Sequence, residues 1–206
     1  MTHTTAKIVK LETFDMKGEW CYFKGHFSPD VCNHILAQGL TISPETPSMG
    51  VANSIINSEF RRGSVRFIQQ DNENFKFLFD ELWKLALQAN DAWFDFHLSK
   101  LSYLQLAEYD EAVQGEYKRH QDVFWINNDP KYHRKLSCII QLTDPDTYEG
   151  GNFELYETTM EQMVPQEIRT QGTVIFIPSF IYHAATPVTK GTRHSVAAWF
   201  DGPKWR

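Results

Sequence analysis

The sequence GTVIFIP, residues 172–178, predicts a buried β-strand. An apolar run of this length that ends at a proline is typical of a β-strand buried on both faces. Other short β-rich segments flank it, with turn sequences between them, at residues 98–106, 116–124, 136–142, 152–156 and 195–200. Many short strands at regular spacing predict a sandwich or barrel, here a jelly-roll-like β core.

The first half of the chain has a different pattern, which predicts helices. Ser28 can cap a helix and Pro29 suits its first turn, so a helix is expected to begin there and to end at Gly39. Over residues 75–89, apolar residues recur at the spacing of one helix face and predict a second helix packed on the core. We therefore expect a mainly β fold covered by a helical layer.

The expected organisation is one domain over residues 1–206, because no linker-like stretch divides the chain. Residues 1–97 are expected to form a strand and helix support region, and residues 98–206 the β core. Residues 41–60 are rich in proline, glycine, asparagine and serine and predict a loop. Whether that loop acts as a lid is left open.

Composition and charge narrow the classes of partner. The 206 residues carry 20 basic and 26 acidic side chains, a formal net charge of -6, and the basic residues form no run. Proteins that bind nucleic acid usually present a basic face, so no nucleic acid partner is expected. The three scattered cysteines, Cys21, Cys32 and Cys138, fit a reducing compartment. With no apolar leader or membrane-length span, we expect a cytoplasmic protein without a membrane partner.

Four residues predict a metal site with an arginine beside it that could bind an anionic ligand. His120 and Asp122 are two positions apart on a predicted strand, so their side chains would share one face. His183 follows the 172–178 strand, and Arg193 lies ten residues further on, across a turn that would place the two on adjacent strands. Two imidazoles and one carboxylate form the facial triad of non-haem Fe(II) oxygenases. The arginine fork suits the carboxylate of a chelating oxo-acid.

Several ordered blocks resemble a known family. LTDPDTYEGG (142–151), PSFIYH (178–183) and TPVTKGTR (186–193) are similar to blocks of the PKHD-type hydroxylases of the prolyl 4-hydroxylase superfamily. The resemblance covers about residues 100–202. It implies a double-stranded β-helix, with Fe(II) held by His120, Asp122 and His183. It also implies 2-oxoglutarate bound through Arg193, O2 as the second cosubstrate, and stimulation by ascorbate.

The same resemblance implies further residues around the cosubstrate. Tyr109 and Ser195 match positions that contact it, Gln141 stands where some relatives carry a second tyrosine, and Trp199 matches a tryptophan beside the site. Trp125 and Tyr132 are aromatic residues in the polar stretch directly after the first two predicted ligands. Because such loops often carry specificity, we expect these two to line a substrate entrance.

The reaction that the resemblance implies is hydroxylation of an unactivated C–H bond, with release of succinate and CO2. A prolyl residue in a protein or peptide is the first substrate class, and a free amino acid or other small molecule is the alternative. A non-catalytic metal-binding jelly-roll protein is the alternative from another class, although such a protein would be expected to lose a ligand or the arginine. No oligomeric state is predicted.

Overall fold

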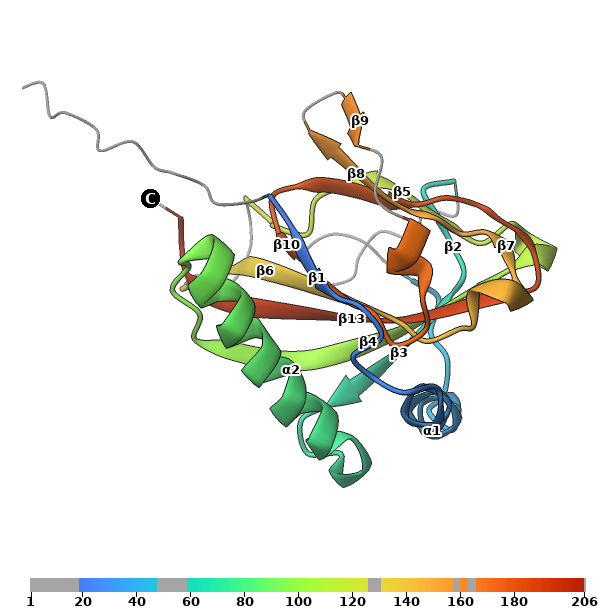
Figure 1. The fold of residues 1–206 in the computed structure, drawn as a ribbon, viewed down its shortest axis with the longest axis horizontal. Coiled ribbons are helices and arrows are strands. Elements are labelled where there is room, and N and C mark those ends of the chain that lie inside the picture. Colours follow the sequence, from blue (N-terminus) through green and yellow to red (C-terminus); the bar gives the residue numbers. More distant parts are fainter. Residues whose placement is uncertain (1–18, 48–58, 126–130, 158–159, 163–165, 206) are drawn as a thin grey trace, which may run out of the picture.

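The computed structural model describes residues 19–47, 59–125, 131–157, 160–162 and 166–205. Two antiparallel sheets form its centre (Figure 1). The major sheet has the strand order β1-β10-β6-β13-β4-β3. Its strands, in chain order, are Cys21–Phe23 (β1), Ser64–Gln69 (β3), Lys100–Asp110 (β4), Tyr132–Gln141 (β6), Val174–Pro178 (β10) and Thr192–Pro203 (β13).

The minor sheet faces the major one and has the strand order β2-β5-β11-β8-β9. Its strands are Arg61–Arg62 (β2), Glu116–His120 (β5), Phe153–Glu157 (β8), Met160–Gln162 (β9) and Tyr182–Ala185 (β11). Glu149–Gly150 (β7) and Val188–Lys190 (β12) form a separate pair. The mainly β jelly roll with added helices confirms the predicted fold class.

Strand β10 shows why the 172–178 stretch is continuously apolar. It is hydrogen-bonded to β1 on one side and β6 on the other. Val174 and Phe176 join the core on the helical side of the major sheet, whereas Ile175 and Ile177 join the cluster between the two sheets. All four side chains are fully buried, so both faces of the strand demand apolar residues.

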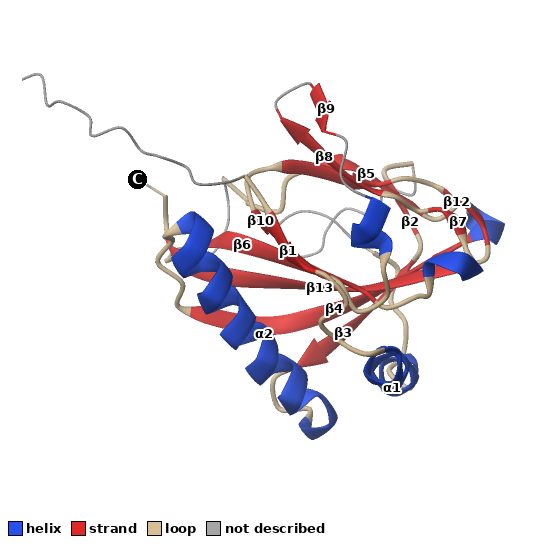
Figure 2. Ribbon diagram, viewed as in Figure 1, coloured by secondary structure: helices blue, strands red, loops and turns tan. Residues whose placement is uncertain are grey.

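Two α-helices cover the face of the major sheet that is turned away from the minor sheet (Figure 2). They are Pro29–Leu40 (α1) and Lys76–Ala89 (α2). Ser28 caps α1 by accepting a hydrogen bond from the Val31 N–H at 3.4 Å, as expected. The predicted stripe on α2 is buried in the core; it comprises Leu78, Phe79, Leu82, Leu85, Ala86 and Ala89.

Single-turn helices complete the described elements: 3-10 turns at Glu73–Phe75, Glu111–Val113, Pro145–Thr147 and Gln166–Arg169, and a π turn at Asn90–Phe94. None of the helices in the described ranges is long and apolar enough to cross a membrane.

The structure corrects several expected boundaries. Gly39 lies inside α1, where a Cβ would stand 2.5 Å from a methyl carbon of Leu106, so this glycine permits close helix–sheet packing and does not end the helix. Strand β3 was not predicted, whereas β11 carries His183, which was expected on a strand. The strand expected over residues 116–124 ends at His120. Much of the suggested lid, residues 48–58, lies outside the described residues.

Candidate active site

The two sheets enclose a cavity lined by side chains from both. His120 on β5 and His183 on β11 are directly paired across adjacent strands of the minor sheet, so their imidazoles reach the cavity side by side. Asp122 joins them although it lies beyond the end of β5, in a loop and not on the predicted strand. The ligating atoms of the three residues all lie within 4.8 Å of one another.

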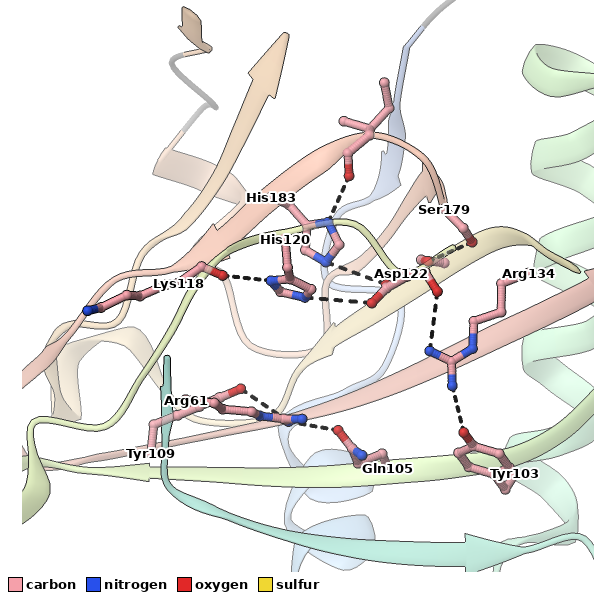
Figure 3. A network of polar contacts seen from close by, with 12 residues as sticks. Arg61, Tyr103, Gln105, Tyr109, Lys118, His120, Asp122, Arg134, Ser179 and His183 are labelled. Carbon is pink, nitrogen blue, oxygen red and sulfur yellow. Dashed lines mark hydrogen bonds and ion pairs between the residues drawn. The ribbon is translucent and has the colours of Figure 1, made fainter. Parts of the chain in front are cut away.

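Because Asp122 lies beyond the end of β5, backbone hydrogen bonds outside the sheet hold it in position. The N–H groups of Asp122 and Val123 both donate to the Ser179 carbonyl, at 2.9 and 3.0 Å. Figure 3 shows Asp122 beside Ser179. Ser179 directly follows β10, and its hydroxyl lies 2.9 Å from that of Ser137 on β6. The turn that leads the chain toward His183 therefore also positions Asp122.

The two imidazoles are oriented as metal ligands are. The Nδ1 atom of His120 lies 2.7 Å from the Lys118 carbonyl, and that of His183 lies 3.0 Å from the Ile181 carbonyl. A carbonyl only accepts, so each Nδ1 carries the proton and each Nε2 keeps its lone pair. These Nε2 atoms face the Asp122 carboxylate at 3.6 and 3.4 Å. The donor set thus fits a divalent metal such as Fe(II).

The electrostatics of the triad support the same protonation states. Burial raises the pKa of the Asp122 carboxyl, but the neighbouring His183, His120 and Arg134 outweigh this and hold the pKa below its usual range. Burial, and then the proximity of His120, lower the pKa of His183 to about 4. Near neutral pH the carboxylate is therefore ionised and His183 is neutral, which are the forms that bind a metal.

Arg193 enters the cavity from the opposite side. It lies on β13 of the major sheet and is 2% exposed, whereas His183 lies in the minor sheet. The expectation of adjacent strands was therefore wrong: the intervening β12 pairs with β7, and the chain crosses from one sheet to the other. The Arg193 Nη2 donates to the Gln141 Oε1 at 2.9 Å. In the described part of the chain, the Arg193 Nε has no hydrogen-bond partner.

The residues expected around the cosubstrate divide into two groups. Tyr109 and Ser195 line the cavity and are 5% exposed; Tyr109 is the Cα partner of Arg193 on β4. Gln141 is not among the lining residues and contacts the guanidinium of Arg193 instead. The structure therefore places Gln141 as a support for Arg193.

The three aromatic residues expected at the substrate side have different positions. Trp199 lines the cavity from β13. Trp125 is 52% exposed and lies outside the cavity lining, with its indole N–H 3.4 Å from the Gln121 Oε1. Tyr132 begins β6, its ring lies 4.4 Å from the Lys100 ammonium, and it does not reach the cavity. The structure thus brings only Trp199 to the site.

Sequence reasoning missed three further residues. The ring of Tyr117 stacks on that of His120 with 3.5 Å between centroids. Arg134 lies 3.9 Å above the Trp199 ring. Arg61 is buried in the cavity lining. Strand alternation would turn Tyr117 and His120, three residues apart, to opposite faces, so the sequence gives no hint of Tyr117; a register shift in the pairing of β5 with β11 lies between the two residues. The positions of both arginines depend on pairing between distant strands.

Comparison with known proteins agrees with this geometry. Residues 104–201 match the family model of the 2OG-Fe(II) oxygenase superfamily. A PKHD-type hydroxylase of Aliarcobacter butzleri is 34% identical over 92 residues, which cover 42% of this chain and 38% of that protein. One from Colwellia psychrerythraea is 29% identical over 92 residues, covering 45% and 40%. The chain thus aligns with about two-fifths of the length of these curated relatives.

Solved structures share the fold across nearly the whole chain. A Pseudomonas putida prolyl-4-hydroxylase has a TM-score of 0.65 at 18% identity, covering 88% of this chain and 91% of that one. A prolyl hydroxylase of Trichoplax adhaerens, in complex with a hypoxia inducible factor peptide fragment, has a TM-score of 0.68 at 16% identity, covering 88% and 83%. The region matched by the family model covers just under half of the chain and carries His120, Asp122, His183 and Arg193, so the residues of the candidate site lie where the chain is similar to the 2OG-Fe(II) oxygenase superfamily.

Proposed function

We propose that this protein is an Fe(II)- and 2-oxoglutarate-dependent dioxygenase that hydroxylates an unactivated C–H bond and releases succinate and CO2. One observation carries the proposal: a metal-type donor triad and a buried arginine open into the same cavity from opposite sheets. Within the described ranges, no carboxylate lies at ion-pair distance from Arg193. A buried guanidinium without a counter-charge is suited to an anionic ligand.

Each residue has a defined part in this proposal. His120, Asp122 and His183 would hold Fe(II), which when bound supplies the reduction of O2 coupled to oxidative decarboxylation of 2-oxoglutarate. Arg193 would bind the distal carboxylate of the cosubstrate, with Tyr109 and Ser195 beside it. Trp199 would form part of the wall on the substrate side. Ascorbate is expected to sustain turnover by keeping the metal reduced.

The first substrate class to test is a prolyl residue in a protein or peptide. The Trichoplax protein of the same fold binds a peptide fragment, and the Pseudomonas protein is a prolyl-4-hydroxylase. Both share only 16–18% of their residues with this chain, so a free amino acid or other small molecule stays as the alternative substrate class.

The test is succinate formation from 2-oxoglutarate after anaerobic loading with Fe(II), with ascorbate present and with a panel of prolyl peptides and free amino acids. Asp122→Ala should abolish turnover. Asp80→Ala, which removes an exposed carboxylate on α2, should leave turnover unchanged. If the wild-type protein bound Fe(II) and 2-oxoglutarate but never produced succinate, the non-catalytic alternative would be favoured. If it bound neither, the proposal would be wrong.

A further inference from the structure

A second buried arginine, Arg61, lies in the same cavity. It is 8% exposed and belongs to β2, at the edge of the minor sheet, where it pairs with Tyr117 of β5. Its side chain reaches toward the major sheet, where Nη2 donates to the Gln105 Oε1 at 2.7 Å (Figure 3). The same Nη2 lies 3.5 Å from the Tyr109 hydroxyl.

The charge of Arg61 is not balanced by a neighbouring carboxylate. Its two polar partners are neutral, and its buried Nε has no hydrogen-bond partner among the residues that the structure describes. No carboxylate of the described part of the chain lies at ion-pair distance from it. The nearby Arg62 and Arg66 are different, since each forms an ion pair at 2.9 Å, with Glu116 and Glu108 respectively. Keeping a guanidinium buried without a counter-ion costs free energy, which an anionic ligand would offset.

The charged group of Arg61 lies close to the proposed metal site. The Arg61 Cζ lies 4.3 Å from the centroid of the Tyr117 ring, which stacks at 3.5 Å on the imidazole of His120. The guanidinium is therefore one ring away from a proposed metal ligand. Of the two carboxylates of 2-oxoglutarate, one would bind the metal and the other Arg193. Arg61 is then left for a different anion.

We propose that Arg61 binds a carboxylate of the substrate, so that the protein acts on molecules with a free carboxylate close to the oxidised C–H bond. This inference rests on the proposed dioxygenase function. Two kinds of substrate carry such a carboxylate. One is a free amino acid or other small carboxylic acid, and the other is a peptide with a carboxylate at its C-terminus or on a side chain. Gln105 acts here as a positioning residue, because its amide oxygen fixes the direction of the guanidinium.

The test compares acids with their amides in the assembled protein. The chain is loaded with Zn(II) as a diamagnetic substitute for iron and saturated with 2-oxoglutarate, which occupies Arg193. Acetate, L-proline and a peptide ending in proline are then titrated, each beside its amide. The Arg61 Nε–H signal, assigned through Arg61→Gln, reports binding. The acid is expected to shift this signal and the amide is not, and binding should weaken about ten-fold or more in Arg61→Gln.

Arg62→Gln is the matched control, since it removes an equal charge from the adjacent residue, whose side chain pairs with Glu116. It should keep the preference for acids. The proposal is overturned if no acid shifts the Arg61 signal more than its amide. It is also overturned if Arg61→Gln weakens 2-oxoglutarate binding as much as Arg193→Gln, because Arg61 would then belong to the cosubstrate site. Failure of the dioxygenase proposal is distinct, since the unsubstituted protein would then bind neither metal nor 2-oxoglutarate, or would bind both without forming succinate.

Discussion

Replacing Gln141 with glutamate tests the anchoring role of Arg193 without changing the shape of the site. The Gln141 side chain is 2% exposed, and its Oε1 accepts a hydrogen bond from the Arg193 Nη2 at 2.9 Å. Glutamate places a carboxylate oxygen at the same position and is almost equal in size. The substitution would therefore neutralise the guanidinium from within the protein.

The expected loss of 2-oxoglutarate affinity follows from the contact between residue 141 and Arg193. Two unit charges about 4 Å apart attract by about 4 kcal/mol at an effective dielectric constant of about 20. A cosubstrate carboxylate would meet an arginine that is already paired, so its affinity should fall by about 3 kcal/mol, or roughly 100-fold. Gln141→Leu removes the hydrogen bond without adding a charge. It should cost no more than about 1.5 kcal/mol, or roughly ten-fold.

The assay is anaerobic calorimetric titration of the Fe(II)-loaded protein with 2-oxoglutarate. Fe(II) affinity is measured separately for each variant, because Gln141 is not among the triad residues and the substitutions should leave metal binding unchanged. Equal 2-oxoglutarate affinity in the glutamate variant and the wild type would contradict the anchoring role of Arg193. Equal losses in the two variants would show that shape, and not charge, controls the contact.

Three further predictions concern stability and reactivity. Gly172→Ala should lower the free energy of unfolding by about 3 kcal/mol or more, because φ is +80° and a Cβ would lie 1.7 Å from the Phe27 carbonyl oxygen. Gly25→Ala, at φ +57°, should cost only about 1 kcal/mol, because the atom nearest to its added Cβ would be 4.0 Å away. Urea unfolding measures both values. Leu82→Ala, in the core face of α2, should lose about 2–5 kcal/mol, whereas Leu87→Ala at 46% exposure should lose less than about 1 kcal/mol. An equal loss of unfolding free energy for the two glycine variants, or for the two leucine variants, would contradict the packing described. Burial raises the pKa of the Cys21 thiol to about 12, so alkylation near pH 8 should be slow until the protein is unfolded, and rapid alkylation of the folded chain would disprove this.

Local pattern was sufficient for most of the fold. The apolar run that became β10 and the helical stripe of α2 are both local signals, and the structure has both elements at these places. Strand β3, Ser64–Gln69, was missed because its sequence shows neither strict alternation of apolar and polar residues nor an unbroken apolar run. Its buried residues do not alternate regularly with the others. The strand expected to contain Asp122 was too long, because its end is set by hydrogen bonds to Ser179, which lies 57 residues away in the sequence.

The proposed site was predicted from residue types in order along the chain, and the structure brings His120, Asp122 and His183 together. Their spacing does not reveal which sheet holds each residue, so His183 and Arg193 were wrongly expected on adjacent strands. Arg61 carried no local signal at all. Its burial follows from the pairing of β2 with β5 and from contacts to β4, which no short window of sequence contains.

A crystal structure of the protein, grown anaerobically with Mn(II) and 2-oxoglutarate, would locate the metal by its anomalous signal and so test the proposed site directly. We expect one metal bound by the Nε2 atoms of His120 and His183 and by the Asp122 carboxylate, with the distal carboxylate of 2-oxoglutarate on Arg193. A folded protein with no metal at the triad, or with 2-oxoglutarate bound away from Arg193, would contradict the proposed site and the function derived from it.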